Sequence, residues 1–276
     1  MKIAVVGLGL IGGSMAKAFM NIEGAEVLGY DRDDVTMARA KLEGVTHGAM
    51  TKDNIGQCDY VFVALYPQAT EEFLKEYAPH ISKQAIVIDC GGTKRGICET
   101  GFKMAKKHGF CFMGGHPMAG THFSGFKYSR ASMFANAAMI LVPAKNETID
   151  VLQKVKNLLV EIGFKSVTIS SAEEHDRIIA YTSQLAHSVS NAYVKSPNAR
   201  VHKGFSAGSY RDLTRVAKLN PRMWTELFLE NSDNIAFEID NIIAELQKYS
   251  DAIKAGDEEK LEALLAEGTK IKESIG

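Results

Sequence analysis

The sequence predicts an α/β protein in which a doubly wound, mostly parallel sheet precedes an all-helical C-terminal domain. Short β-rich runs alternate with helical patterns over residues 1–170, which is typical of βαβ units. After about Ser170 the strand pattern stops and helical segments follow. A glycine-rich stretch directly after the first β-rich run is the third observation. We therefore expect a nucleotide-binding sheet domain over residues 1–170 and a helical domain over residues 171–276.

Composition excludes several function classes. The chain has 276 residues with 32 Lys and Arg against 33 Asp and Glu, and its net charge of −1 gives no general attraction to nucleic acid or membranes. Its four cysteines lack CxxC or metal-ligand spacing, so we expect free thiols in a reducing compartment and no metal site. No apolar run reaches the roughly 20 residues of a membrane helix, and a strand begins at once. We expect a cytoplasmic protein without a signal peptide.

The expected strands share short length, β-favouring residues and turn-forming neighbours. They are Lys2–Gly7, Glu26–Tyr30, Tyr60–Leu65, Ala85–Asp89, Phe110–Gly114, Ala137–Val142 and, at an edge, Ser166–Ile169. The helical stretches between them include Ser14–Met20, Thr36–Leu42, Thr70–Tyr77 and Gly96–Lys107. The second domain is expected to hold four helices, Ala172–Lys195, Ala207–Lys218, Pro221–Lys248 and Asp257–Lys272. The groove between the two domains is the expected substrate site.

The first loop matches the G-x-G-x-x-G pattern of dinucleotide-binding Rossmann folds, with Leu8, Leu10 and Ile11 between Gly7, Gly9 and Gly12. Gly7 would make the tight turn, Gly9 would let the backbone approach the pyrophosphate, and Gly12 would allow close helix packing. Asp31, 19 residues after Gly12, would bond the ribose 2′-hydroxyl and repel a 2′-phosphate. NAD is therefore expected, although Arg32 could soften the preference. The alternative is a glycine-rich turn without a nucleotide.

Two later strand ends would border the same crevice, because doubly wound sheets bind ligands at the carboxyl ends of their strands. We assign Leu65, Tyr66, Pro67 and Gly91 from these ends to the cofactor. Lys94 lies in the second of these loops. It either meets an anionic substrate or is a solvated surface charge, and the sequence does not separate these two readings.

His116 is the candidate proton acceptor. It lies in the stretch Gly114–Thr121, which we predict to be a glycine-flanked loop after a strand. A neutral imidazole, with a reference pKa of about 6.5, can accept the hydroxyl proton of an alcohol that is losing a hydride. Pro117 restricts His116 to extended backbone conformations, which would aim the side chain. The alternative is a structural histidine bonded to backbone.

The helical domain offers hydrogen-bonding and cationic side chains. In the expected helix Ala172–Lys195 an uncharged polar stripe faces either a ligand or solvent, and it consists of Ser183, His187, Ser190 and Asn191. Arg211 and Arg215 lie four positions apart, on one helix face, and suit carboxylates unless Asp212 pairs with them. Trp224 is expected to anchor the core.

Taken together, four motifs resemble the prephenate/arogenate dehydrogenase family of tyrosine biosynthesis. They are Gly7–Ser14, Asp89-Cys-Gly-Gly-Thr-Lys, Gly114–Thr121, and Tyr210-Arg-Asp-Leu-Thr-Arg followed by Trp224. The resemblance spans essentially the whole chain, in order. It implies an NAD-dependent oxidative decarboxylation of prephenate to 4-hydroxyphenylpyruvate, or of arogenate to tyrosine. It also implies a homodimer whose helical domains interlock.

The resemblance further implies residue roles. His116 would accept the hydrogen bond of the substrate's C4 hydroxyl, and Arg215 would bind the ring carboxylate. His187 and Arg211 would lie near the side-chain end of the substrate. Further substrate-binding positions are Gly208, His122 and Gln184.

Three positions depart from the family pattern. Gly92 stands where many members have a serine that bonds the reacting oxygen, so Thr93 is the candidate replacement. His122 stands in place of a glutamate and Gln184 in place of a histidine, which leaves prephenate and arogenate both open. Two rival interpretations remain. One is another Rossmann-type dehydrogenase, such as a β-hydroxyacid dehydrogenase or pyrroline-5-carboxylate reductase, and the other is a non-catalytic NAD-binding regulator.

Overall fold

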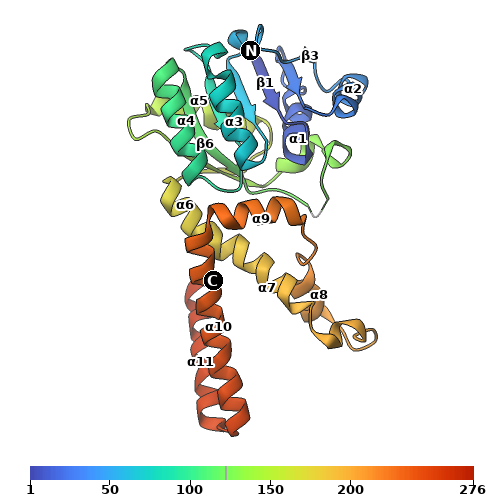
Figure 1. Cartoon of the computed structure of the whole chain (residues 1–276), viewed down its shortest axis with the longest axis vertical. Coiled ribbons are helices and arrows are strands. Elements are labelled where there is room, and N and C mark those ends of the chain that lie inside the picture. Colours follow the sequence, from blue (N-terminus) through green and yellow to red (C-terminus); the bar gives the residue numbers. More distant parts are fainter. Residues whose placement is uncertain (122) are drawn as a thin grey trace.

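The protein has two parts, a helix-flanked sheet and a helical assembly below it (Figure 1). The computed structural model describes residues 1–121 and 123–276. The sheet has eight strands in the order β3-β2-β1-β4-β5-β6-β7-β8. All neighbouring strands run parallel except β6 and β7, which pair antiparallel. This confirms the predicted fold class of a doubly wound, mostly parallel sheet followed by a helical domain.

All seven predicted strands form, with ends shifted by a few residues. The strands are β1 Lys2–Val6, β2 Glu26–Tyr30, β3 Gly48–Ala49, β4 Tyr60–Val63, β5 Ile86–Asp89, β6 Cys111–Pro117, β7 Ala138–Pro143 and β8 Ser166–Ile169. β3 was not predicted, because two residues are too short for an alternating pattern. It pairs with β2 through Leu28 and Gly29 and forms one edge of the sheet.

Helices cover both faces of the sheet, and each face has its own apolar core. The helices of this part are α1 Leu10–Phe19, α2 Asp34–Leu42, α3 Pro67–Tyr77, α4 Arg95–His108 and α5 Ile149–Glu161. On the face of α1 and α5, Phe19, Phe62 and Leu158 belong to one buried cluster. On the face of α3 and α4, Leu74 and Phe112 belong to the other. Burial of these faces from water stabilises the layered arrangement.

β6 differs from its predicted form in a way that matters for the site. The strand continues through Pro117, so His116 lies in a strand and the prediction of a loop was wrong. The physical reason is the antiparallel neighbour β7, which pairs His116 with Ile140. Gly115 is required because a Cβ there would lie 2.3 Å from the carbonyl oxygen of Asp89. The strand therefore holds His116 more firmly than a loop would.

The second part consists of helices, of which α9 lies across the end of the sheet domain while the others extend away from it (Figure 1). Its elements are α6 Ala172–Ile179, a π-helical segment Ala180–Leu185, α7 Ala186–Tyr193, α8 Gly208–Thr214, α9 Pro221–Glu230, α10 Ser232–Ala255 and α11 Glu258–Ile275. α10 and α11 form a long hairpin that projects away from the sheet (Figure 1). Across residues 1–121 and 123–276, the helices are too short or too polar to span a bilayer.

The predicted single helix Pro221–Lys248 is broken at Asn231, which separates α9 from α10. The side chain of Asn231 is fully buried, and its Nδ2 donates to the carbonyl oxygen of Asp176 and to Oε1 of Gln184. These contacts with α6 and the π-helical segment require a sharp change of direction. The break was not predictable from helical periodicity, because it is stabilised by tertiary hydrogen bonds.

Candidate functional site

The glycine loop between β1 and α1 has the geometry of a pyrophosphate cradle. Gly7 has a φ of +86°, which favours glycine, and a Cβ on Gly12 would lie 1.9 Å from the carbonyl oxygen of Gly7. A Cβ on Gly9 would meet nothing within 4 Å, so this side of the loop is open. α1 has no side-chain cap at Gly9, which leaves the amides of its first turn available to a phosphate. The loop therefore fits a dinucleotide.

Asp31 directly follows β2, beside this loop. Its Oδ2 accepts a hydrogen bond from the amide of Leu8 at 2.8 Å, and its Oδ1 accepts one from the amide of Asp33 at 3.0 Å. The carboxylate is therefore held next to the glycine turn, where an acidic residue can reach a ribose. Arg32 follows it and is exposed.

The other proposed cofactor residues lie at the ends of β4 and β5. A Cβ on Gly7 would lie 2.7 Å from Cδ2 of Leu65, so the β1 and β4 loops adjoin each other at the point where the strand order reverses. Tyr66 is exposed and Pro67 opens α3. Gly91 is buried, and its amide donates to Oδ2 of Asp89 at 2.8 Å.

Both readings of Lys94 were wrong. Its side chain has no solvent exposure, and its Nζ pairs with the equally buried carboxylate of Asp89. The same carboxylate accepts the amides of Gly91 and Gly115, so it links the ends of β5 and β6. Lys94 thus acts within the protein, and its charge faces the histidines described next rather than solvent or substrate.

His116 points from β6 toward α6 of the helical domain. Its Nδ1 lies 2.9 Å from Nε2 of His175, and Nδ1 of His175 lies 2.7 Å from Oδ1 of Asp176. Burial holds the pKa of His116 well below its usual range, and the neighbouring His175 and Lys94 act in the same direction. His116 is therefore a neutral base at physiological pH, with Nε2 as the nitrogen left for a substrate.

The residues at the turn after β5 face α9. Thr93 is 2% exposed and its Oγ1 donates to Oε2 of Glu230 at 2.6 Å. A Cβ on Gly92 would lie 3.1 Å from Cδ2 of Leu227, so α9 closes over the position where a serine is common. Burial raises the pKa of Glu230, and the bond from Thr93 opposes that rise. The hydroxyl of Thr93 donates its hydrogen bond to Glu230, and its oxygen can still accept a hydrogen bond.

His187 lies on α7, where its Nδ1 is 2.8 Å from the carbonyl oxygen of Ser183. Its ring lies 4.1 Å from that of Trp224, which is half-buried on α9 and so is not the core anchor expected from sequence. The pKa of His187 lies below its usual value. Burial is the main cause and the charge of Arg215 adds to it, while the bond to Ser183 acts in the opposite direction. The structure thus brings His187, Trp224 and Arg215 together.

The remaining predicted substrate residues either bond to other protein groups or lie on α8, apart from His116. Gln184 is buried, with Nε2 donating to the carbonyl oxygen of Leu227 and Oε1 accepting from Asn231. Gly208 and Arg211 lie on α8, where Arg211 is largely exposed beside Asp212. His122 lies outside the described residues. In the predicted polar stripe, Ser190 and Asn191 donate to carbonyl oxygens of Leu213 and Ala217 and so hold the α8 segment in place.

Sequence reasoning missed His175 and Asp176. These two residues lie in the first turns of the first helix after the sheet, and their adjacency was the available signal. Their importance depends on a contact between residues 59 positions apart, His116 and His175, which no local pattern predicts.

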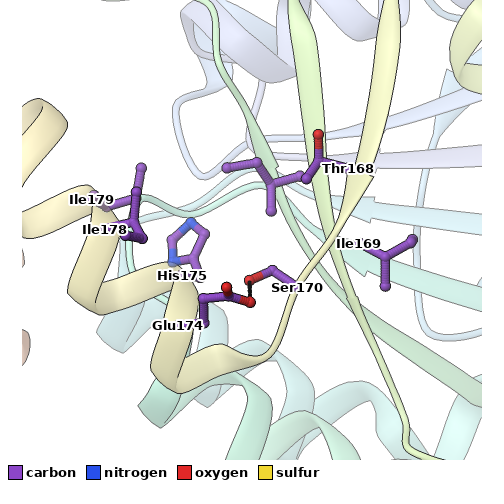
Figure 2. A pocket seen from close by; sticks show the side chains of 8 residues that line it. Thr168, Ile169, Ser170, Glu174, His175, Ile178 and Ile179 are labelled. Atoms are coloured by element: carbon purple, nitrogen blue, oxygen red, sulfur yellow. Dashed lines mark hydrogen bonds between the residues drawn. The ribbon is translucent and has the colours of Figure 1, made fainter. Parts of the chain in front are cut away.

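A separate small cavity of about 190 Å³ lies between the sheet edge and α6 (Figure 2). Thr168 and Ser170 contribute from the end of the sheet, and Ile178, Ile179 and His175 contribute from α6. Ser170 Oγ donates to Oε2 of Glu174 at 3.0 Å within it. His175 lines this cavity although its side chain has no solvent exposure.

Comparisons with known proteins agree along the whole chain. A family model described as the nucleotide-binding domain of prephenate dehydrogenase matches residues 16–168, and one for its dimerization domain matches residues 171–267. The chain is 32% identical to a prephenate dehydrogenase of Bacillus subtilis, over 94% of this chain and 72% of that protein. It is 30% identical to a cyclohexadienyl dehydrogenase of Zymomonas mobilis, over 92% of this chain and 89% of that protein.

Two solved structures have the same fold over nearly their whole length. Prephenate dehydrogenase from Aquifex aeolicus, in complex with hydroxyphenyl propionate and NAD+, has a TM-score of 0.85 at 28% identity, with 100% of this chain and 98% of that chain covered. Synechocystis arogenate dehydrogenase has a TM-score of 0.83 at 25% identity, with 100% of both chains covered.

Proposed function

The chain belongs to the prephenate dehydrogenase family, and we propose that it catalyses the NAD-dependent oxidative decarboxylation of prephenate to 4-hydroxyphenylpyruvate. The observation that carries the proposal is the position of His116 at the carboxyl end of β6, on the edge of the sheet that also carries the glycine loop. A neutral imidazole and a dinucleotide cradle at one edge suit the removal of a proton and a hydride from one alcohol.

NAD is held, in this proposal, by the loop Gly7–Gly12 and the strand-end residues Leu65, Tyr66, Pro67 and Gly91. The uncapped amides at the start of α1 would receive the pyrophosphate, and Asp31 would bond the ribose. When bound, NAD supplies the hydride acceptor. The carboxylate of Asp31 favours NAD over a cofactor with a 2′-phosphate, with Arg32 as a weak opposing charge.

His116 acts on the C4 hydroxyl of the substrate. As the C4 hydride leaves, Nε2 of His116 accepts the hydroxyl proton, so that the oxygen develops carbonyl character. The bond from the ring to its carboxylate then breaks, and its electron pair enters the ring as CO2 departs. Nε2 of His116 returns the proton to the phenolate oxygen, and the net reaction releases no proton. We keep Thr93 as the candidate that bonds the reacting oxygen; in this role its hydroxyl would turn from Glu230 and donate its hydrogen bond to that oxygen.

The substrate's two carboxylates need cations, because the net charge of the chain is only −1. We assign Arg215 to the ring carboxylate, and His187, whose ring packs against Trp224, to the side-chain end of the substrate. Arg211 and Gly208 lie on α8, in a segment that projects from the helical part, and are assigned to the side-chain end. Arginine forks match carboxylates in bidentate geometry, which suits this role.

Arogenate is the second candidate substrate, and one observation favours it. Nδ1 of His187 donates to the carbonyl oxygen of Ser183, so Nε2 of the neutral ring is a hydrogen-bond acceptor. An acceptor suits the ammonium group of arogenate better than the keto group of prephenate. Both Gln184 groups are already bonded within the protein, so Gln184 adds no preference.

The functional unit in this proposal is a cytoplasmic homodimer that forms through the helical domain. Support for the dimer comes from the match to a dimerization domain and from large apolar side chains that are exposed along α10 and α11. These are Phe237, Ile243, Leu246, Ile253, Leu265, Ile271 and Ile275. The four free thiols suit a reducing compartment.

Product analysis tests the function. Purified protein is incubated with NAD and either prephenate or arogenate, and NADH, CO2 and the aromatic product are measured together. We expect equal amounts of NADH, CO2 and 4-hydroxyphenylpyruvate from prephenate. Tyrosine from arogenate, with no product from prephenate, would make arogenate the substrate in place of prephenate. NAD binding without any product would contradict both and favour a non-catalytic regulator.

A further inference from the structure

We propose that His175 and Asp176 are positioning residues that fix the tautomer of His116, so that Nε2 of His116 faces the substrate without a proton. The three side chains form one hydrogen-bonded row from α6 to β6. Asp176 Oδ1 contacts Nδ1 of His175 at 2.7 Å, and Nε2 of His175 contacts Nδ1 of His116 at 2.9 Å. The role rests on the proposed function, because it concerns the proton acceptor of that reaction.

The direction of the row is set at its Asp176 end. Oδ1 of Asp176 also accepts the amide of Lys94 at 2.7 Å, and Oδ2 accepts the amide of Arg95 at 2.9 Å. Burial acts to raise the pKa of Asp176, but these bonds and the one from His175 outweigh it and leave the pKa below its usual value. Asp176 is therefore an ionised carboxylate, which only accepts hydrogen bonds. Nδ1 of His175 must carry the proton of the first bond.

His175 transmits this constraint because it is neutral. Burial lowers its pKa, the bond to Asp176 opposes the decrease, and the charge of Lys94 adds to it. With its proton on Nδ1, the neutral ring has Nε2 as an acceptor. Nδ1 of His116 then carries the proton of the second bond, and Nε2 of His116 has its lone pair free. The opposite tautomer of His116 would carry a proton on Nε2 and could not act as a base.

The charged groups around the row favour the same state. Lys94, from the loop before α4, repels a proton from both histidines, and Asp89 on β5 pairs with Lys94 within the sheet. Asp176 is held rigidly, since it accepts the two amides at the start of α4 and Nε of Arg95 lies 3.4 Å from its Oδ2. The carboxylate of Asp176, which caps α4, therefore also orients His116. The row thus links the helical part to the sheet at the reacting centre.

The magnitude of such an effect is known from serine proteases, where a carboxylate that holds an imidazole in the correct tautomer contributes about 10⁴ in kcat. Here the carboxylate acts through a second ring, and the expected effect is smaller. We expect loss of the bond to His116 to lower kcat by about 10²-fold, at the lower limit of what a general base contributes.

The test compares His175→Gln with His175→Leu. The glutamine side chain reaches the position of Nε2 and has an oxygen that accepts from Nδ1 of His116, whereas leucine fills similar space without an acceptor. We expect His175→Gln to retain kcat within about 10-fold and His175→Leu to lose about 10²-fold. Both variants should bind NAD as the wild type does, which isothermal titration calorimetry measures. Equal losses in both variants, or no loss in either, would overturn the proposal.

A second measurement does not depend on turnover. Long-range proton–nitrogen NMR correlations identify which ring nitrogen of His116 carries the proton. We expect Nδ1 to be protonated in the wild type and in His175→Gln, with Nε2 protonated in a large fraction of His175→Leu. A wild-type His116 with its proton on Nε2 would contradict the proposed role of His175 and Asp176. If the wild type shows the expected tautomer but turns over neither substrate, the proposed function fails while the positioning role of these two residues stands.

Discussion

At the scale of single residues, the chemistry of the site depends on which groups are kept neutral. His116 and His187 lie in different parts of the protein, yet burial lowers the pKa of both and each has a cationic neighbour, Lys94 or Arg215. Nδ1 of each ring is engaged with a protein group, which leaves Nε2 as the free nitrogen. In the proposed function, these two imidazoles offer acceptor nitrogens to the substrate.

The lowered pKa of His116 predicts the pH dependence of the reaction. A base with a pKa below 6.5 stays unprotonated as the pH falls from 8 to 6.5, so kcat/KM should stay level over this range. The fraction of neutral His116, and kcat/KM with it, should decrease only when the pH is well below 6.5. Initial rates of NADH formation at subsaturating substrate measure the profile. A decline centred above pH 6.5 would show that the environment of His116 does not favour its neutral form.

Asp31 predicts cofactor choice. In Asp31→Asn, one amide oxygen can still accept from Leu8, but the negative charge that opposes a 2′-phosphate is gone. We expect KM for NAD to rise by about 10-fold, from loss of a charged hydrogen bond, and KM for NADP to fall. Asp33→Asn is the matched control, since Asp33 caps α2 two residues further on. Unchanged KM values in Asp31→Asn would remove Asp31 from the ribose site.

His116 could be identified from sequence as the candidate base, because its loop-like motif and proline neighbour are local features. Its partners could not, since the row to His175 and Asp176 forms only when α6 packs on the end of β6. Thr93 was predicted as the replacement for a serine that bonds the reacting oxygen, and its bond to Glu230 on α9 likewise depends on packing between the two parts.

At the scale of elements, the π-helical segment Ala180–Leu185 decides where His187 points. His175 and His187 are 12 positions apart, which would separate them by about 120° around a regular α-helix. A π-helical turn accommodates roughly one extra residue, so His187 follows His175 by the equivalent of about eleven α-helical residues. The two side chains are then separated by only about 20° around the helix axis. Ser183 lies within the segment, and its carbonyl oxygen accepts from His187. Sequence periodicity assumed one continuous α-helix and could not place the insertion.

The π-helical segment should tolerate the deletion of one residue but not the insertion of one. Deleting the exposed residue Thr182 should convert the segment to regular α-helix and keep both histidines on one face. Inserting an alanine after Thr182 should rotate His187 by about 100° away from Trp224. We expect the deletion to retain at least about a tenth of the wild-type kcat/KM and the insertion to lose about 10²-fold or more. The rates are compared with helix content from circular dichroism, and equal damage from both changes would contradict the register role.

At the scale of the whole molecule, the sheet domain could be predicted well because its signals are local. The glycine loop, alternating strands and capped helices predicted seven of the eight strands. The helical domain was predicted less well, because the break at Asn231 and the π-helical segment are stabilised by contacts between distant helices. The α10–α11 hairpin has few buried side chains of its own, so its stability in this shape requires a further surface.

That surface is, in our proposal, a second copy of the chain. Leu246 is 59% exposed at the centre of an apolar stripe on α10, and Leu246→Glu places a charge in the interface. We expect the variant to dissociate to monomers at micromolar concentration, measured by light scattering after size-exclusion chromatography. Glu245→Lys is the control, because Glu245 is exposed about 100° around α10 from Leu246, on a side that carries none of the exposed apolar side chains named above. A wild-type chain that is monomeric would contradict the dimer, as would dissociation of both variants.

The central claim is that His116 removes the hydroxyl proton as the hydride leaves, and the rate of NADH formation by His116→Asn tests it most directly. Asparagine keeps a hydrogen-bonding group on β6 but cannot take up the proton. The account predicts that kcat with prephenate or arogenate falls by about 10²–10⁴-fold, while the dissociation constant of NAD stays unchanged. A kcat within a few-fold of wild type would show that the proton goes elsewhere, and the mechanism would have to be abandoned.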